Sequence, residues 1–251
     1  MTFGRSLAAA TVALFLCAAS DSFAASSVQS PAPLTPTHAS TATLTSAAAV
    51  YAHPDGDKPL RMVWSETMWT GRPSVLLITS SRRDAYGELW LKVMLPVRPN
   101  GSSGWIRASH ARIGDTDMRI EISLRARELR VRKAGHLVLA SEVVVGKAET
   151  PTPRGLFAVY ERADAPPGAV IGPFALHLTA FSNVLHSYDG GPGRVAIHGR
   201  AGMLLADPLG SAASHGCIRI NNGMLRRLAR LAPPGTPVVI AMGWPAQIRR
   251  S

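Results

Sequence analysis

Residues 119–146 read RIEISLRARELRVRKAGHLVLASEVVVG, and this stretch decides the fold class. Its apolar residues alternate with polar ones, which is the two-residue period of strands that bury one face. The clearest apolar positions are Ile120, Ile122, Leu124, Leu129 and Val131. The stretch therefore predicts strands that open a β-rich domain.

The pattern continues toward the C-terminus. We expect further strands at 156–160, 174–178, 195–198 and 238–241, with turns at 151–153 and 233–235. Only residues 223–232 place leucines at helical spacing with arginines on the opposite face. The sequence therefore predicts a mainly β domain with one short helix over residues 115–243.

A second, smaller β domain is predicted at residues 46–112. Short apolar runs at 75–78 and 89–95 are separated by glycine and proline turns, including the turn at 98–101. Four tryptophans could form stacking surfaces for sugars, although in a small β domain they are more often part of the core. These residues are Trp64, Trp69, Trp90 and Trp105.

The first 24 residues predict a secretory signal peptide. Arg5 precedes an apolar run from 7 to 19, and the small residues Ser22 and Ala24 suit a cleavage site. A membrane anchor is the alternative, but the run is shorter than the roughly 20 residues that a spanning helix needs. Residues 25–45 are rich in Ala, Ser, Thr and Pro, which predicts a disordered linker.

Cleavage would leave Cys217 as the lone cysteine of a secreted chain. Such proteins usually pair their cysteines, so an unpaired thiol suggests intermolecular pairing or reactivity. The formal net charge of +11 favours anionic surroundings, which outside a cell means wall polymers or a membrane surface rather than nucleic acid. Simple solubility is an equally good explanation of the charge.

A nucleophilic cysteine needs a neighbouring base, because the thiolate is the reactive form. His198, His215 and His177 are the candidates, and we favour His198 because a histidine on a neighbouring strand can face the thiol and keep it ionised. Gly216 permits a backbone conformation closed to other residues. We expect the amides of Gly216 and Cys217 to stabilise an oxyanion.

Four blocks in order resemble the L,D-transpeptidase catalytic domain, also called the YkuD domain. They are TPTPRGLF at 150–157, IHGR at 197–200, SHGCIRI at 214–220 and GTPVVI at 235–240. The resemblance covers about half of the chain and implies a β-sandwich. Residues 90–109, WLKVMLPVRPNGSSGWIRAS, resemble the small SH3-like β-barrels that precede wall-modifying domains. A β spacer without a ligand is the alternative for this part.

The resemblance also implies roles for individual residues. Cys217 would be the nucleophile and His198 its base, with the carbonyl of Gly199 orienting the imidazole. Four further residues would shape the donor pocket and the oxyanion hole, namely Ser214, His215, Gly216 and Arg219. Arg200 replaces a small residue that often follows the HG pair, which affects the expected acceptor preference.

The implied reaction is acyl transfer on peptidoglycan stem peptides in the cell envelope. Cys217 would form a thioester and release D-alanine, and an amine from a second stem or a protein would then take the acyl group. No metal or cofactor is expected, nor a stable membrane span after cleavage. The expected partners are stem peptides and anionic wall polymers.

Three other hypotheses compete with this one. Water could resolve the same thioester, which would make the protein an L,D-carboxypeptidase. His198, His215 and Cys217 could bind zinc, although three ligands without a further partner are a weak metal signature. A non-catalytic wall-binding protein would keep Cys217 as an inert thiol. We interpret His177, His186 and His136 as ordinary strand or loop residues, and Arg219 as either a carboxylate ligand or a solvated strand residue.

Overall fold

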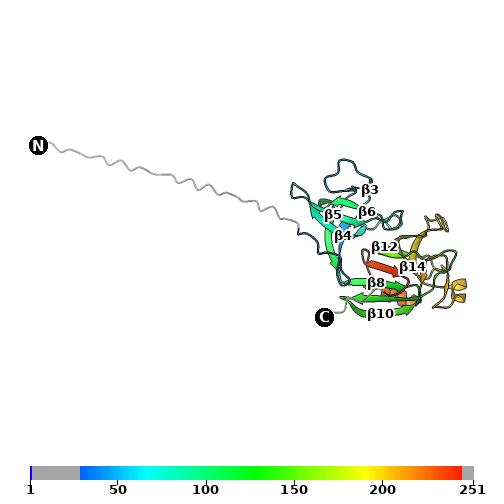
Figure 1. The fold of residues 1–251 in the computed structure, drawn as a ribbon. Helices are drawn as coiled ribbons and strands as arrows, with labels where there is room; N and C mark the ends of the chain where they lie inside the picture. The colour runs from blue at the N-terminus through cyan, green and yellow to red at the C-terminus, as the bar shows by residue number, and fades with distance from the viewer. Residues whose placement is uncertain (2–28, 245–251) are drawn as a thin grey trace.

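The computed structural model describes Met1 and residues 29–244 (Figure 1). The rest of the predicted signal peptide and the first residues of the predicted linker lie outside the described residues. Within the described part of the chain, we find no helix with the length and apolar character that a membrane crossing requires.

The N-terminal part is built on a five-stranded antiparallel sheet with the strand order β6-β5-β4-β1-β7. Its side chains bury a core of their own that includes Leu76, Leu91 and Ile106. The strands are β1 (Ala39–Leu44), β4 (Val75–Arg83), β5 (Leu89–Met94), β6 (Ser103–Arg107) and β7 (Ala111–Thr116), with the paired strands β2 (Ala48–Val50) and β3 (Arg61–Val63) beside them and the 3-10 helix η1 (Ala108–His110) before β7.

Strand β1 lies in the stretch 25–45 that we assigned to a disordered linker, so that assignment is wrong for Ala39–Leu44. β1 pairs with β4 on one side and with β7 on the other. Its small side chains fit into the sheet, and Ala42 and Leu44 are buried in the core. Amino-acid composition did not predict this strand, because a strand between two others is stabilised by backbone hydrogen bonds on both edges, whatever its side chains.

The second part is an eight-stranded mixed sheet with the order β10-β9-β8-β17-β12-β13-β14-β16. A short parallel pair, β11 with β15, lies beside it. The strands are β8 (Met118–Ser123), β9 (Glu128–Lys133), β10 (His136–Glu142), β11 (Val145–Gly146), β12 (Gly155–Asp164), β13 (Phe174–Phe181), β14 (Arg194–His198), β15 (Ala212–Ser214), β16 (Ile218–Arg219) and β17 (Pro237–Ala241), and the 3-10 helix η2 (Gly202–Ala206) follows β14.

Helix α1 (Asn222–Leu231) is the single α-helix of the described residues, as the sequence predicted. Asn221 caps it by accepting a hydrogen bond from the Gly223 N–H at 2.8 Å. Leu225 and Leu228 are fully buried in the core formed by the sheet. The alternating residues at 119–146 behave as predicted, because Ile120 and Ile122 are fully buried in the same core. The prediction of a mainly β fold is thus confirmed.

The two parts pack directly against each other (Figure 1). Ala158 of β12 is buried in a cluster with Ala39, Leu77 and Met94 of the N-terminal sheet. Thr179 of β13 donates a hydrogen bond to the sulfur of Met94 at 3.2 Å. The N-terminal part is therefore placed to contribute side chains to sites on the larger sheet.

Candidate active site

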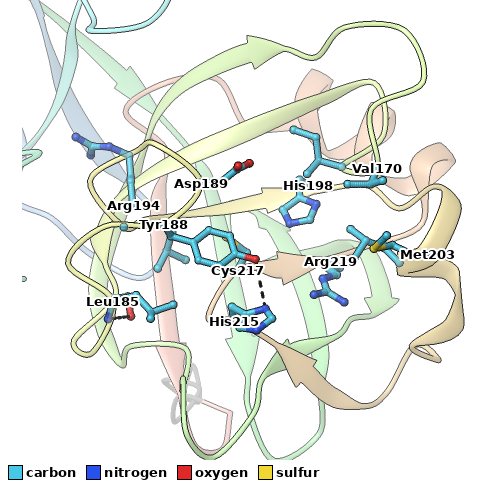
Figure 2. Close-up of a pocket in the computed structure, with 15 residues that line it drawn as sticks. Val170, Leu185, Tyr188, Asp189, Arg194, His198, Met203, His215, Cys217 and Arg219 are labelled. Atoms are coloured by element: carbon cyan, nitrogen blue, oxygen red, sulfur yellow. Dashed lines mark hydrogen bonds between the residues drawn. The ribbon is translucent and has the colours of Figure 1, made fainter.

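Two neighbouring parallel strands bring Cys217 and His198 to one cavity. His198 is the last residue of β14, and Cys217 directly precedes β16, which pairs with β14. Both side chains line a cavity of about 200 Å³, together with Tyr188, His215 and Arg219 (Figure 2). The fold thus brings together residues that are 19 positions apart in the sequence.

The turn before Cys217 is closed by Ser214. Its Oγ donates to the carbonyl of Cys217 at 2.6 Å and accepts from the N–H of Gly216 at 3.1 Å. Gly216 has φ +112°, a conformation that residues with a Cβ rarely adopt. Ser214 therefore fixes the shape of the turn that presents the thiol.

The threonines of the TPTP block hold this turn from outside. Thr152 donates its hydroxyl to the carbonyl of Gly216 at 2.9 Å, and Thr150 donates to the carbonyl of Ser214 at 3.2 Å. Both threonines are buried. The block at 150–157 thus supports the Cys217 turn, a role that the sequence alone did not reveal.

The N–H of Gly216 is not free to stabilise an oxyanion, contrary to the prediction. Its N–H already donates to Ser214 Oγ, so it is not presented to a ligand in this structure. The reason is local, since the turn places the serine side chain two residues back along the chain against that amide. The amide of Cys217 remains the proposed oxyanion donor.

The His198 ring is held in its neutral form. The ring is buried, and its Nδ1 lies 2.8 Å from the carbonyl of Gly199, which only accepts hydrogen bonds. Nδ1 must therefore carry the proton, and Nε2 keeps its lone pair. Burial lowers the pKa of His198 to about 4, partly offset by the hydrogen bond to Gly199.

Asn222 at the start of α1 fixes the two residues after His198. Its side chain accepts from the N–H of Arg200 at 2.9 Å and donates to the carbonyl of Arg200 at 3.0 Å. A Cβ at Gly199 would lie 1.9 Å from Asn222 Oδ1, so only glycine fits there. No motif pointed to Asn222, because it lies outside the recognised blocks.

Cys217 is half-buried and protonated in the resting state. Burial raises the pKa of its thiol, and the Ala196 backbone and Arg219 lower it by less. Among the hydrogen bonds of the described residues, none joins the sulfur to His198. The expectation that the imidazole keeps the thiol ionised is therefore wrong for the free protein, in which both groups are neutral.

This neutral pair predicts slow alkylation. Because the pKa of the thiol is raised, a smaller fraction of Cys217 is ionised at pH 7 than of a free cysteine. The rate of Cys217 carboxamidomethylation by iodoacetamide should therefore be low at pH 7 and still rise beyond pH 9, as followed by intact mass. A plateau reached below pH 7.5 would contradict a protonated thiol.

Arg219 is buried at the wall of the same cavity. Its guanidinium forms an ion pair with Asp207, which follows η2, and Asp207 also accepts from Arg200 through its backbone carbonyl. The solvated alternative for Arg219 is thus wrong, since only 6% of the residue is exposed. The sequence missed Asp207, which lies in an irregular segment without a motif.

Residues 182–193, here called the cavity loop, separate this cavity from a second one. Tyr188, Asp189 and Gly193 line both, and so do Cys217 and His198. The second cavity has a volume of about 480 Å³ and also contacts His177. Tyr188 Oη lies 3.4 Å from Nδ1 of the exposed His215, so this predicted site residue contacts the loop (Figure 2). Cys217 therefore lies where the two cavities meet.

Arg98 of the N-terminal part holds both ends of the cavity loop. Its guanidinium donates to the carbonyls of Ser182, Leu185 and Pro192 at 2.7, 3.1 and 3.1 Å. Asn100 adds a reciprocal pair with the backbone of Phe181, at 2.7 and 2.8 Å. Sequence reasoning identified this segment only as a turn and missed its contact with the site.

The described residues contain no group of three His, Cys, Asp or Glu side chains that could hold a metal ion. The zinc hypothesis for His198, His215 and Cys217 therefore has no geometric support. His177 on β13 lines the second cavity, where its ring lies against Trp69 with ring centroids 4.3 Å apart.

Comparisons with known proteins give a consistent family for the second part of the chain. Residues 117–240 match the family model of the L,D-transpeptidase catalytic domain, YkuD. The YkuD protein of Bacillus licheniformis is 34% identical over 122 residues, which is 49% of this chain and 64% of that protein. The YkuD protein of Bacillus subtilis is 29% identical over 121 residues, covering 48% and 64%. The chain thus spans less than two thirds of the length of these relatives.

Solved structures with a similar arrangement include two L,D-transpeptidases. An Enterococcus faecium enzyme has 23% identity and a TM-score of 0.38, with 49% of each chain covered. The enzyme of Mycobacterium smegmatis has 15% identity and a TM-score of 0.40, with 61% of this chain and 90% of that one covered. Residues 117–240 are thus similar to the L,D-transpeptidase catalytic domain of the YkuD type.

Proposed function

We propose that this protein is a peptidoglycan L,D-transpeptidase of the cell envelope, with Cys217 as nucleophile. The observation that carries the proposal is the shared cavity of Cys217 and His198 inside a YkuD domain. A neutral imidazole whose Nε2 is unprotonated is a competent acceptor for the thiol proton. The exported location follows from the predicted signal peptide and from the substrate.

The first half-reaction forms a thioester. His198 Nε2 takes the proton of the Cys217 thiol as the sulfur attacks the amide carbon between an L-centre and the terminal D-alanine of a stem peptide. The amide of Cys217 stabilises the oxyanion. The imidazolium then returns the proton to the departing amine, so D-alanine leaves and the acyl group stays on sulfur.

The second half-reaction transfers the acyl group. An amine of a second stem attacks the thioester, His198 takes its proton and returns it to the sulfur as the new amide forms. Two cavities that meet at Cys217 give donor and acceptor separate approaches. We assign the carboxylate of one stem to Arg219, whose orientation Asp207 supports.

Mass spectrometry of purified disaccharide-tetrapeptides incubated with the protein tests this proposal. Transfer gives a dimer that has lost one D-alanine, and hydrolysis gives a tripeptide, the product of the carboxypeptidase alternative. Unchanged tetrapeptide after prolonged incubation would refute catalysis on this substrate. The SH3-like assignment of the N-terminal part and its affinity for anionic wall polymers belong to the same proposal.

The contacts of Arg98 lead to a prediction about the cavity loop. Arg98→Met removes the three hydrogen bonds to the loop carbonyls and should lower kcat/KM about tenfold, because the loop walls both cavities. The loss should appear largely in KM, and Arg98→Lys should restore part of it. Arg107→Met is the matched control, since Arg107 pairs with Glu88 on the exposed surface. Equal effects of the two methionine variants would contradict this role.

A further inference from the structure

Large apolar side chains are exposed together on one segment of the N-terminal part. Trp64 is 68% exposed and Trp69 is 41% exposed. Their neighbours Leu60, Met62 and Met68 are exposed as well. Contiguous apolar surface of this kind marks interaction sites, because exposing large apolar side chains to water does not stabilise the fold. We call Met62, Trp64, Met68 and Trp69 the aromatic surface.

The aromatic surface continues into the catalytic cavities. Trp69 lines the second cavity, which Cys217 also lines. Met62, Trp64 and Met68 line a neighbouring cavity of about 270 Å³. Arg194 forms part of the wall of both. A ligand that enters from the N-terminal part can thus run from Trp64 past Trp69 toward the thiol.

The catalytic domain fixes the position of Trp69. The residues on either side are anchored, because the N–H of Met68 donates to Tyr160 Oη at 3.3 Å and the Thr70 hydroxyl donates to Glu161 at 2.9 Å. Glu161 is fully buried at 1% exposure. The Trp69 ring also lies 4.3 Å from the ring of His177. The indole of Trp69 is therefore a fixed part of the wall of the second cavity.

The chemistry around these rings fits a saccharide. Arg61 and Glu66 line the cavity beside Trp64, and Asp164 and Thr70 line the one beside Trp69. Flat aromatic faces bordered by charged and hydroxyl groups match a sugar chain, which presents apolar C–H faces and hydroxyls. An anionic lipid surface fits poorly, since residues 55–70 carry three acidic against two basic residues in a chain of net charge +11.

We propose that the aromatic surface binds the glycan strand that carries the stem peptide, with Trp64 and Trp69 stacking on its sugar rings. The identity of the glycan rests on the proposed function, because the stem peptide at Cys217 is attached to that strand. The N-terminal part thereby selects stems that are still joined to glycan over free peptides. Trp64 and Trp69 are specificity-determining residues, and neither takes part in the chemistry.

The test compares two donors in the same assay, the free tetrapeptide and the disaccharide-tetrapeptide. Trp64→Ala should raise KM for the disaccharide-tetrapeptide about fivefold to tenfold and leave KM for the free tetrapeptide unchanged. Trp69→Ala should raise KM for both donors, and by more for the disaccharide-tetrapeptide, because Trp69 also lines the second cavity. Tyr86→Ala is the control, since Tyr86 is 88% exposed on the β4 to β5 turn. Equal changes with both donors, or no change with either, would overturn the proposal.

A binding measurement separates this proposal from the proposed function. Glycan oligomers stripped of stem peptides are titrated into the Cys217→Ala protein by calorimetry. Binding that Trp64→Ala weakens and Tyr86→Ala leaves intact supports the glycan site even if the wild-type protein turns over neither donor. Absence of binding to the stripped oligomers overturns the glycan site even if transpeptidation is observed.

Discussion

Cys217→Ala is expected to abolish thioester formation and every reaction that follows it. The variant lacks the sulfur that attacks the stem peptide, and the Ser214 hydroxyl of the same turn is held by the Cys217 carbonyl and the Gly216 N–H. We expect turnover to fall at least about 10⁴-fold. Intact mass spectrometry should show an acyl adduct on the wild-type protein after mixing with tetrapeptide and none on the variant.

The fold of this variant should be unaffected. Cys217 is half-buried, and its carbonyl, which accepts from Ser214, is retained in alanine. We expect the free energy of unfolding to change by less than about 1 kcal/mol, measured by urea denaturation. Cys217→Ser preserves the volume of the side chain better than Cys217→Ala does. It should be almost as inactive as the alanine variant, because a serine hydroxyl is ionised far less readily than a thiol. Crosslinking by either variant at the wild-type rate would refute the mechanism with Cys217 as nucleophile.

His198→Ala is expected to cost about 10³-fold in kcat with little change in KM. The imidazole is the acceptor for the thiol proton, and general base catalysis of this kind contributes about 10² to 10⁴-fold. His177→Ala is the matched control, since His177 lies on the neighbouring strand β13 and also lines the second cavity. It should cost less than about tenfold. Similar losses for the two variants would reassign the base.

The pH profile gives an independent check on His198. Its pKa is lowered to about 4 in the folded protein, so the ring stays neutral, and able to accept a proton, at any pH well above 4. The acylation rate of the wild-type protein should therefore fall only as the pH drops through about 4. An acid limb near pH 6.5, measured by single-turnover adduct formation, would indicate an ordinary solvated histidine instead.

Sequence reasoning predicted the larger domain well because its signals are local. Alternation at Ile120 and Ile122 reports a strand that buries one face, and the helix at 222–231 has both a capping asparagine and leucines at helical spacing. The linker assignment failed at Ala39–Leu44 because strand pairing there depends on partners more than 30 residues away, such as Leu77 and Gly114. Composition carries no information about such partners.

The site was predicted only where motif residues form it. The blocks identified Cys217 and His198, which do line one cavity. Arg98 and Asp207 were missed because each acts through contacts with distant backbone or side chains, in segments that have no pattern of their own. The protonated state of the thiol was missed for another reason, since burial is a property of the packed structure and not of the SHGC sequence.

The half-buried, protonated sulfur also affects how the protein withstands oxidants. Peroxides react with thiolates far faster than with thiols, and the first product is a sulfenic acid that a second cysteine would normally rescue. A chain processed as predicted would carry no second cysteine to perform that rescue. Keeping the sulfur un-ionised until a substrate arrives protects it from irreversible damage between turnovers.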